Sequence, residues 1–167
     1  MLKIASARNM ELSASTQSRL VFLVRVTERI CSNLLFTDAR LFGETSTIED
    51  AQKIEFDPIL AERLDAFVLR FGRLQDTVGD KLLPALLISM AEKPGPAIDN
   101  LDRAEKLGYI HSADAWMEMR RLRNQMVHEY IEDLAILASA LRTGHAFVPS
   151  LVKSARLCVE QAKRLIK

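Results

Sequence analysis

The sequence predicts an all-α protein, an antiparallel up-and-down bundle of four to five helices formed by one domain over residues 1–167. Two observations carry this prediction. Apolar residues recur at three-to-four spacing along most of the chain, and no stretch of useful length alternates apolar and polar residues as a strand does. The chain is also long enough to bury one sizeable core, and its 49% hydrophobic and 27% charged residues are typical of a soluble globular protein.

The N-terminal part of the chain predicts one long helix followed by a polar connection. Within residues 19–35 the apolar side chains recur at three-to-four spacing, and Thr27 fills the gap in their seam. Residues 43–56, GETSTIEDAQKIEF, are mostly polar and predict a loop or a short helical connection.

A second long helix is predicted to begin at Asp57 and Pro58, because a capping residue followed by a proline is a common first turn. Gly79 and Pro84 should bend or interrupt this helix further on. Before that point its apolar seam steps by four and three residues in turn, through Leu60, Leu64, Phe67, Phe71, Leu74 and Val78.

Two shorter signals organise the middle of the chain. Residues 92–100, EKPGPAIDN, break the helical pattern, and a short helix around Leu101 follows and should end at Gly108. Ser112 is then expected to cap a further helix. Asp114 lies in the first turn of that helix, where a carboxylate interacts favourably with the positive end of the helix dipole.

The last helix is predicted to follow one apolar seam over residues 131–166, with a bend near Gly144 and Pro149. His145 lies in that seam and is interpreted as a core histidine. His111 precedes the cap of the preceding helix and is expected to be exposed.

Composition excludes several classes of protein. The net charge of +1 argues against a general nucleic-acid coat, although it allows a local basic patch. Cys31 and Cys158 lie far apart in apolar surroundings and lack metal-ligand spacing, so we expect buried free thiols and a reducing compartment. No glycine-rich phosphate loop, metal-spaced set or nucleophile elbow occurs, so we expect no cofactor and no metal.

The sequence contains no recognisable signal peptide and no apolar run long enough to span a membrane. The first residues, MLKIASARNMELSAS, have no apolar core followed by a small-residue cleavage site. The longest apolar run, residues 82–91, is too short to span a bilayer and is broken by Pro84. We therefore expect a cytoplasmic protein that does not cross a membrane.

The segment RRLRNQMVHEYIED, residues 120–133, places an arginine inside the face that its helix should bury. At about 100° per residue from Trp116, one sector roughly 140° wide gathers the apolar side chains. This sector contains Met119, Leu122, Met126, Val127 and Tyr130. Arg123 falls within the same sector. Arg120, Asn124 and His128 are spaced four residues apart and line one edge of this sector.

Two interpretations of this arginine stay open, because a buried guanidinium is unfavourable unless it is paired or the site is wet. In the first, Arg123 pairs with a carboxylate from another helix, and His128 and Tyr130 are hydrogen-bonded packing residues. In the second, these residues line a polar cleft. There the arginine binds a phosphate, and the histidine, which titrates near neutral pH, moves protons.

The segment RNQMVHEY fits the pattern R-x4-H-x-Y, with Arg123, His128 and Tyr130 at the fixed positions. This pattern resembles the signature of the HEPN superfamily, and specifically that of HepT-like toxins. The resemblance covers residues 101–133, with Trp116 one turn into the helix; the helices on either side agree only as helices. It implies a helical-bundle ribonuclease that is paired with a minimal nucleotidyltransferase (MNT) as antitoxin.

The resemblance implies roles that suit these side chains. Metal-independent RNA cleavage needs a base for the 2′-hydroxyl, an acid for the leaving 5′-oxygen and positive charge on the phosphorane. His128 would serve as base or acid. Arg123, which cannot deprotonate, would hold the scissile phosphate. Asn124 would orient His128 or a phosphate oxygen, and Arg120 would support the site.

Geometry and resemblance agree on a homodimer. Arg123 and His128 point about 140° apart around one helix, which fits a single small site poorly. In the family two such helices meet about a two-fold axis, so that both subunits line one cleft.

Tyr130 has a second implication. In the resembling family the partner nucleotidyltransferase attaches AMP to this tyrosine, and the added charge and bulk would block RNA. The alternative is a core aromatic with a satisfied hydroxyl. Asp76 and Arg73 lie on the side of their helix away from its seam. They could pair with the motif or line a dimer surface, or they could be solvated charges.

Two rival functions remain. The chain could be a non-catalytic HEPN accessory subunit that presents substrate to a separate nucleotidyltransferase, which its nearly neutral charge favours. It could also be a dimeric helical bundle without catalytic function. The accessory-subunit function leaves the set of Arg123, His128 and Tyr130 without an explanation.

Overall fold

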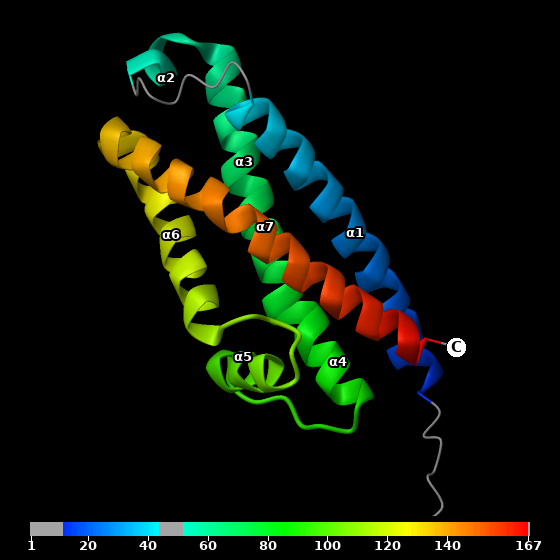
Figure 1. The fold of residues 1–167 in the computed structure, drawn as a ribbon. Helices are drawn as coiled ribbons and strands as arrows, with labels where there is room; N and C mark the ends of the chain where they lie inside the picture. The colour runs from blue at the N-terminus through cyan, green and yellow to red at the C-terminus, as the bar shows by residue number, and fades with distance from the viewer. Residues whose placement is uncertain (1–11, 44–51, 167) are drawn as a thin grey trace, which may run out of the picture.

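The computed structural model describes residues 12–43 and 52–166, with the backbone alone for residues 52 and 129–132. All regular structure in this part of the chain is helical, so the prediction of an all-α protein is confirmed there (Figure 1). In chain order the elements are α1 (Ala14–Phe42), α2 (Gln52–Phe56), α3 (Pro58–Asp76), the π-helical segment η1 (Thr77–Leu82), α4 (Leu83–Ser89), α5 (Ala97–Lys106), α6 (Ala113–Glu132) and α7 (Leu134–Leu165).

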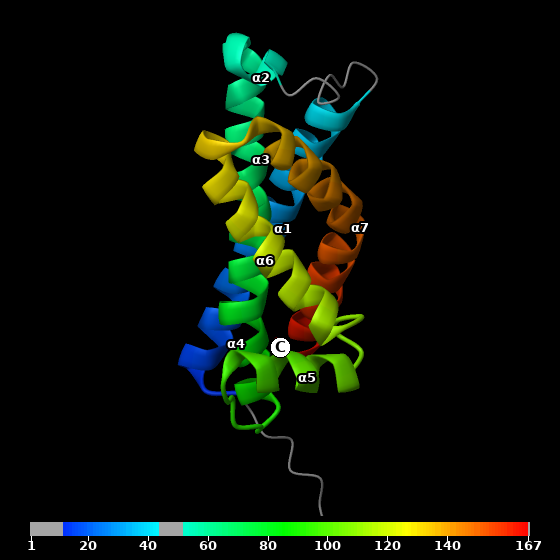
Figure 2. The same ribbon diagram turned by 90° about the vertical axis from the view of Figure 1, so that its left-hand side faces the viewer.

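The described residues form six helical bodies, where four or five were predicted. In this count α3, η1 and α4 are one body, because they continue into one rod. Helix α1 packs against this rod and against α7, and α6 packs against α7 and α3. Helix α5 lies across the end of the bundle, below α6 in Figure 2. One continuous cluster of buried apolar side chains draws on all of these elements.

The start of the rod follows the sequence signal. The Asp57 carboxylate accepts hydrogen bonds from the backbone N–H groups of Ile59 (3.0 Å) and Leu60 (3.1 Å), and Pro58 occupies the first turn. All six residues of the predicted seam are buried. That part of the sequence prediction is confirmed.

A bend or an interruption was predicted near Gly79 and Pro84, and there the α-helical pattern changes to the π-helical η1 without breaking the rod. In a continuous α-helix, Pro84 would remove one donor and its ring would clash with the carbonyl of residue 80. The wider turns of η1 accommodate this change, and the Leu83 N–H reaches the Val78 carbonyl five residues back. Pro84 then lies in the first turn of α4.

Asp133 caps the start of α7. Its carboxylate accepts hydrogen bonds from the backbone N–H groups of Ala135 (2.9 Å) and Ile136 (3.1 Å). It continues through Pro149 without a break and curves over the other helices (Figure 2). By length and composition alone α7 could also cross a membrane. Its buried face packs against α1 and α6.

The interpretation of His145 as a core histidine is wrong. Its side chain is exposed, with Nδ1 2.7 Å from Asp38 Oδ1 and its ring stacked on Phe42. Gly144 takes the buried position instead, because its missing side chain leaves room for the Phe67 ring and for Met126. His111 is exposed, as predicted.

Both cysteines are buried free thiols, which confirms the sequence prediction. Burial raises the pKa of Cys31 to about 11 and that of Cys158 to about 12.

Candidate functional site

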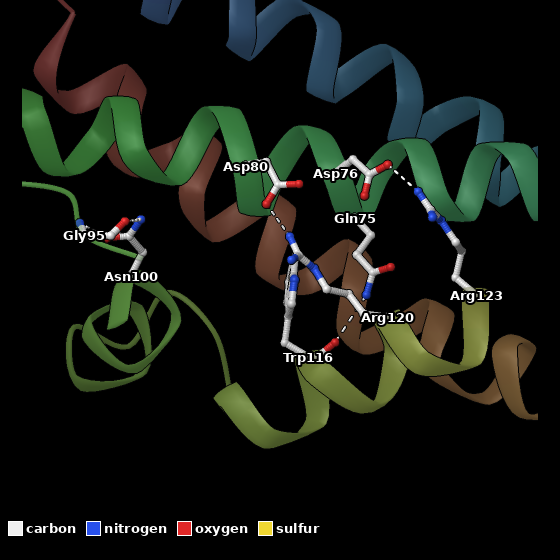
Figure 3. Close-up of polar contacts among 8 residues, drawn as sticks. All are labelled: Gln75, Asp76, Asp80, Gly95, Asn100, Trp116, Arg120 and Arg123. Carbon is white, nitrogen blue, oxygen red and sulfur yellow. Dashed lines mark hydrogen bonds and ion pairs between the residues drawn. The ribbon is translucent and has the colours of Figure 1, made fainter. Parts of the chain in front are cut away.

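The register of α6 against the rod is fixed at its N-terminal end. The Ser112 hydroxyl accepts from the Ala115 N–H (3.1 Å), as predicted, and a Glu105 carboxylate oxygen accepts from the Ala113 N–H (2.7 Å). One turn later, the buried Trp116 packs into the core. Its carbonyl accepts a hydrogen bond from the Gln75 amide (3.2 Å), which joins α6 to α3 (Figure 3).

Two ion pairs then connect the rod to α6. Arg123 Nη2 donates to Asp76 Oδ2 at 2.6 Å, and Arg120 pairs with Asp80 one turn further along the rod (Figure 3). The two aspartates are four residues apart and the two arginines are three apart, so each set lies along one side of its helix. Arg123 Nη1 also donates to the Asn124 side-chain oxygen at 3.1 Å.

Two glycines make room for these arginines. A Cβ built on Gly72 would lie 2.8 Å from Arg123 Nε, closer than real contacts allow. A Cβ on Gly79 would lie 3.1 Å from the Trp116 indole nitrogen and 3.3 Å from Arg120 Nη2. Sequence reasoning missed Gly72 and treated Gly79 only as a bend. The available signal was their spacing of seven residues, which puts both on one face of the rod.

Arg123 therefore combines features of both interpretations. It pairs with a carboxylate from another helix, as the first interpretation requires. Its side chain is nevertheless 34% exposed, and that of Asp76 is 43% exposed, so the pair is not buried. The prediction that the whole sector is buried is wrong for Arg123 and for Val127, which is 54% exposed. The Arg123 side chain fills the space beside Gly72, and a groove between the helices adjoins this contact.

That groove is a cavity of about 530 Å³ between α3 and α6. Arg123 lines it together with Gly72, Asp76 and the exposed Arg73. A smaller cavity of about 180 Å³ lies between Arg120 and Arg123 and is lined by polar side chains only: Gln75, Asp76, Asp80, Arg120, Arg123 and Asn124. Two buried polar atoms of its lining residues, Gln75 Oε1 and Arg120 Nε, lack a hydrogen-bond partner among the described residues. This cavity is therefore suited to a polar group.

The structure brings together only part of the predicted set. Asp76, Asn124 and Arg123 form one connected cluster. His128 is exposed and lines neither cavity. The backbone of Tyr130 belongs to α6, and its side chain lies outside the described part.

Within residues 12–43 and 52–166, no group of three or more histidine, cysteine or acidic side chains is placed to hold a metal ion. The cluster can offer the remaining N–H donors of Arg123, which is paired with Asp76, to an anion, and the same helix carries a histidine. Comparison of the chain with protein-family models, with curated proteins and with solved structures gave no match.

Proposed function

We propose that this protein is a metal-independent endoribonuclease of the HEPN type, a HepT-like toxin that acts in the cytoplasm. The observation that carries the proposal is the state of Arg123. Asp76 and Asn124 hold its guanidinium, Gly72 leaves room for the side chain, and the side chain stays 34% exposed beside the groove. The guanidinium has five N–H donors, and among the described residues only these two side chains accept from it, so donors remain for a phosphate.

The chemistry of the motif fits this role. Arg123 neutralises the phosphorane because it stays charged throughout. His128, which is exposed, exchanges protons with the 2′-hydroxyl or the leaving 5′-oxygen. Asp76 fixes the arginine without a metal ion.

The first test is cleavage of RNA by the purified protein in the presence of a chelator. We expect products with a 2′,3′-cyclic phosphate or the derived 3′-phosphate. His128→Ala should lower the rate by about 10²–10⁴ and, because the side chain is exposed, leave the melting temperature unchanged. A wild-type protein that cuts no RNA and is harmless when expressed would favour the accessory-subunit function, which the net charge of +1 also suits.

The proposal includes a homodimer, because a single copy leaves His128 outside the cavity that Arg123 lines. In the proposed site, Arg123 of one copy and His128 of a second copy act on one phosphate. The test mixes Arg123→Ala with His128→Ala after both are unfolded and refolded together. Heterodimers then hold one intact composite site, so about a quarter of the wild-type activity should return. If both groups act within one chain, the mixture stays inactive.

Control by an MNT-type nucleotidyltransferase is the remaining part of the proposal. We place Tyr130 as the residue to which the partner attaches AMP, since it follows His128 by two residues on the same helix. Incubation with the partner enzyme, ATP and magnesium should add adenylate mass at Tyr130, and Tyr130→Phe should abolish the gain. With an active partner and no gain in mass, restraint would instead come from complex formation.

A further inference from the structure

The groove between α3 and α6 has a gradient of polarity along its length. Near η1 its lining has a net positive charge, with Arg73, Lys81 and the ion pair of Arg123 with Asp76. Among the described residues neither Arg73 nor Lys81 has an ion-pair partner. Toward the start of α3 the lining becomes aliphatic, through Val68, Leu69, Met126 and Val127.

The aliphatic side chains at this end of the groove are exposed to solvent. Leu69 is 58% exposed and Val127 is 54% exposed, and they face the groove from opposite helices. Two apolar walls of this kind suit a flat ring, which would be held between them. The neighbouring cations suit a phosphate joined to that ring.

From these features we infer that the groove is a nucleotide subsite, which takes the nucleobase next to the phosphate held by Arg123. The inference rests on the proposed ribonuclease function and adds the part of the RNA that sets base preference. The cavity volume of about 530 Å³ is ample for one nucleotide.

The length of the groove agrees with this occupant. Asp65 lines its far end, and Gly72, which touches Arg123, lies seven residues later on α3. Seven residues of α-helix rise about 10 Å. The distance from a phosphate to the far edge of the base in the same nucleotide is similar, so a phosphate on Arg123 brings that edge near Asp65.

Asp65 gives the subsite a preference. An ionised carboxylate only accepts hydrogen bonds, so it favours a base edge that donates them. Guanine, adenine and cytosine present an exocyclic amino group, whereas uracil presents two carbonyl oxygens and one N–H. We therefore infer that amino-bearing bases are preferred over uracil at this position.

The test is calorimetric binding of the four nucleoside 3′-monophosphates, which are products of the proposed cleavage and cannot be cut again. We expect the guanosine, adenosine and cytidine forms to bind more tightly than the uridine form. Leu69→Ala and Val127→Ala should each weaken binding by about tenfold, because each removes one apolar wall. Asp65→Asn, which can donate as well as accept, should reduce the discrimination against uridine. The matched control is Ile88→Ala, since Ile88 is 54% exposed outside the groove.

The outcomes separate this inference from the proposed function. Cleavage of RNA without nucleotide binding, or binding unchanged in Leu69→Ala, would overturn the subsite and leave the ribonuclease standing. Nucleotide binding with the expected variant effects, in a protein that cuts no RNA, would support the subsite and reject the ribonuclease. Sedimentation adds a third result. If Leu69→Ala dissociates a dimer and nucleotide binding does not change, the groove is an interface between copies and the inference is wrong.

Discussion

Gly72→Ala is expected to separate the position of Arg123 from the stability of the fold. The new Cβ would lie 2.8 Å from Arg123 Nε, so the side chain must move by at least about 0.6 Å to reach the 3.4 Å of ordinary contact. Alanine in a helix interior is favoured over glycine by about 1 kcal/mol. A partly exposed ion pair such as Arg123–Asp76 contributes only about 0–1 kcal/mol. Because these effects oppose each other, the melting temperature should stay within about 4 °C of the wild type.

The catalytic effect of Gly72→Ala should be much larger. Displacement of a phosphate-binding group by about 1 Å can lower a rate by about 10². We expect a loss of that order in single-turnover cleavage of RNA, measured beside thermal unfolding of the same preparations. A Gly72→Ala protein that cleaves at the wild-type rate, while Arg123→Ala is inactive, would refute the claim that Gly72 sets the working position of this arginine.

Gly79→Ala is the matched control, seven residues further along the same rod. Its Cβ would meet the buried Trp116 indole and the end of Arg120, with nothing of Arg123 among its nearest atoms. The indole cannot move away as easily as an arginine side chain, so this variant should lower the melting temperature. Its cleavage rate per folded molecule should fall much less than that of Gly72→Ala.

Two further predictions concern single side chains. Asp76→Ala should reduce RNA cleavage more than Asp76→Asn, because an amide oxygen can still accept from Arg123 Nη2, and neither should shift the melting temperature by more than about 4 °C. Burial raises the pKa of Cys31 from 9.0 to about 11, so above pH 9 the unfolded chain loses this proton more readily than the folded chain. The contribution of this thiol to the free energy of unfolding is fully present below about pH 9 and is lost as the pH rises toward about 11. Denaturant titrations across this range should therefore show a smaller decline in the free energy of unfolding for Cys31→Ala than for the wild type.

The sequence was sufficient for those parts of the fold that depend on local signals. The α3 seam and the cap at Asp57 follow from helical period and capping chemistry, which act within a few residues. His145 shows where this reasoning fails. A seam drawn from hydrophobicity prefers a large residue, whereas the core uses the neighbouring Gly144, because Phe67 from another helix fills the space.

The candidate site depended more strongly on contacts between helices. The motif itself could be found in the sequence, since Arg123 and His128 lie within one helix. Asp76 was one of the candidate partners, and the structure confirms its pair with the motif. The sequence alone could not decide between pairing and solvation, because Asp76 is 47 residues earlier and the pairing depends on how α6 is aligned against the rod. The same alignment sets the position of Arg123, because it places the arginine against Gly72, where a Cβ would collide with its side chain.

Folding stability alone does not account for this arrangement. Gly72 within α3 costs about 1 kcal/mol relative to alanine, and the partly exposed Arg123–Asp76 pair returns at most about the same amount. These two effects are of similar size and opposite sign. An arginine held by a carboxylate and left open to a groove is useful when an anion must bind there, and the phosphate of RNA in the proposed reaction is such an anion.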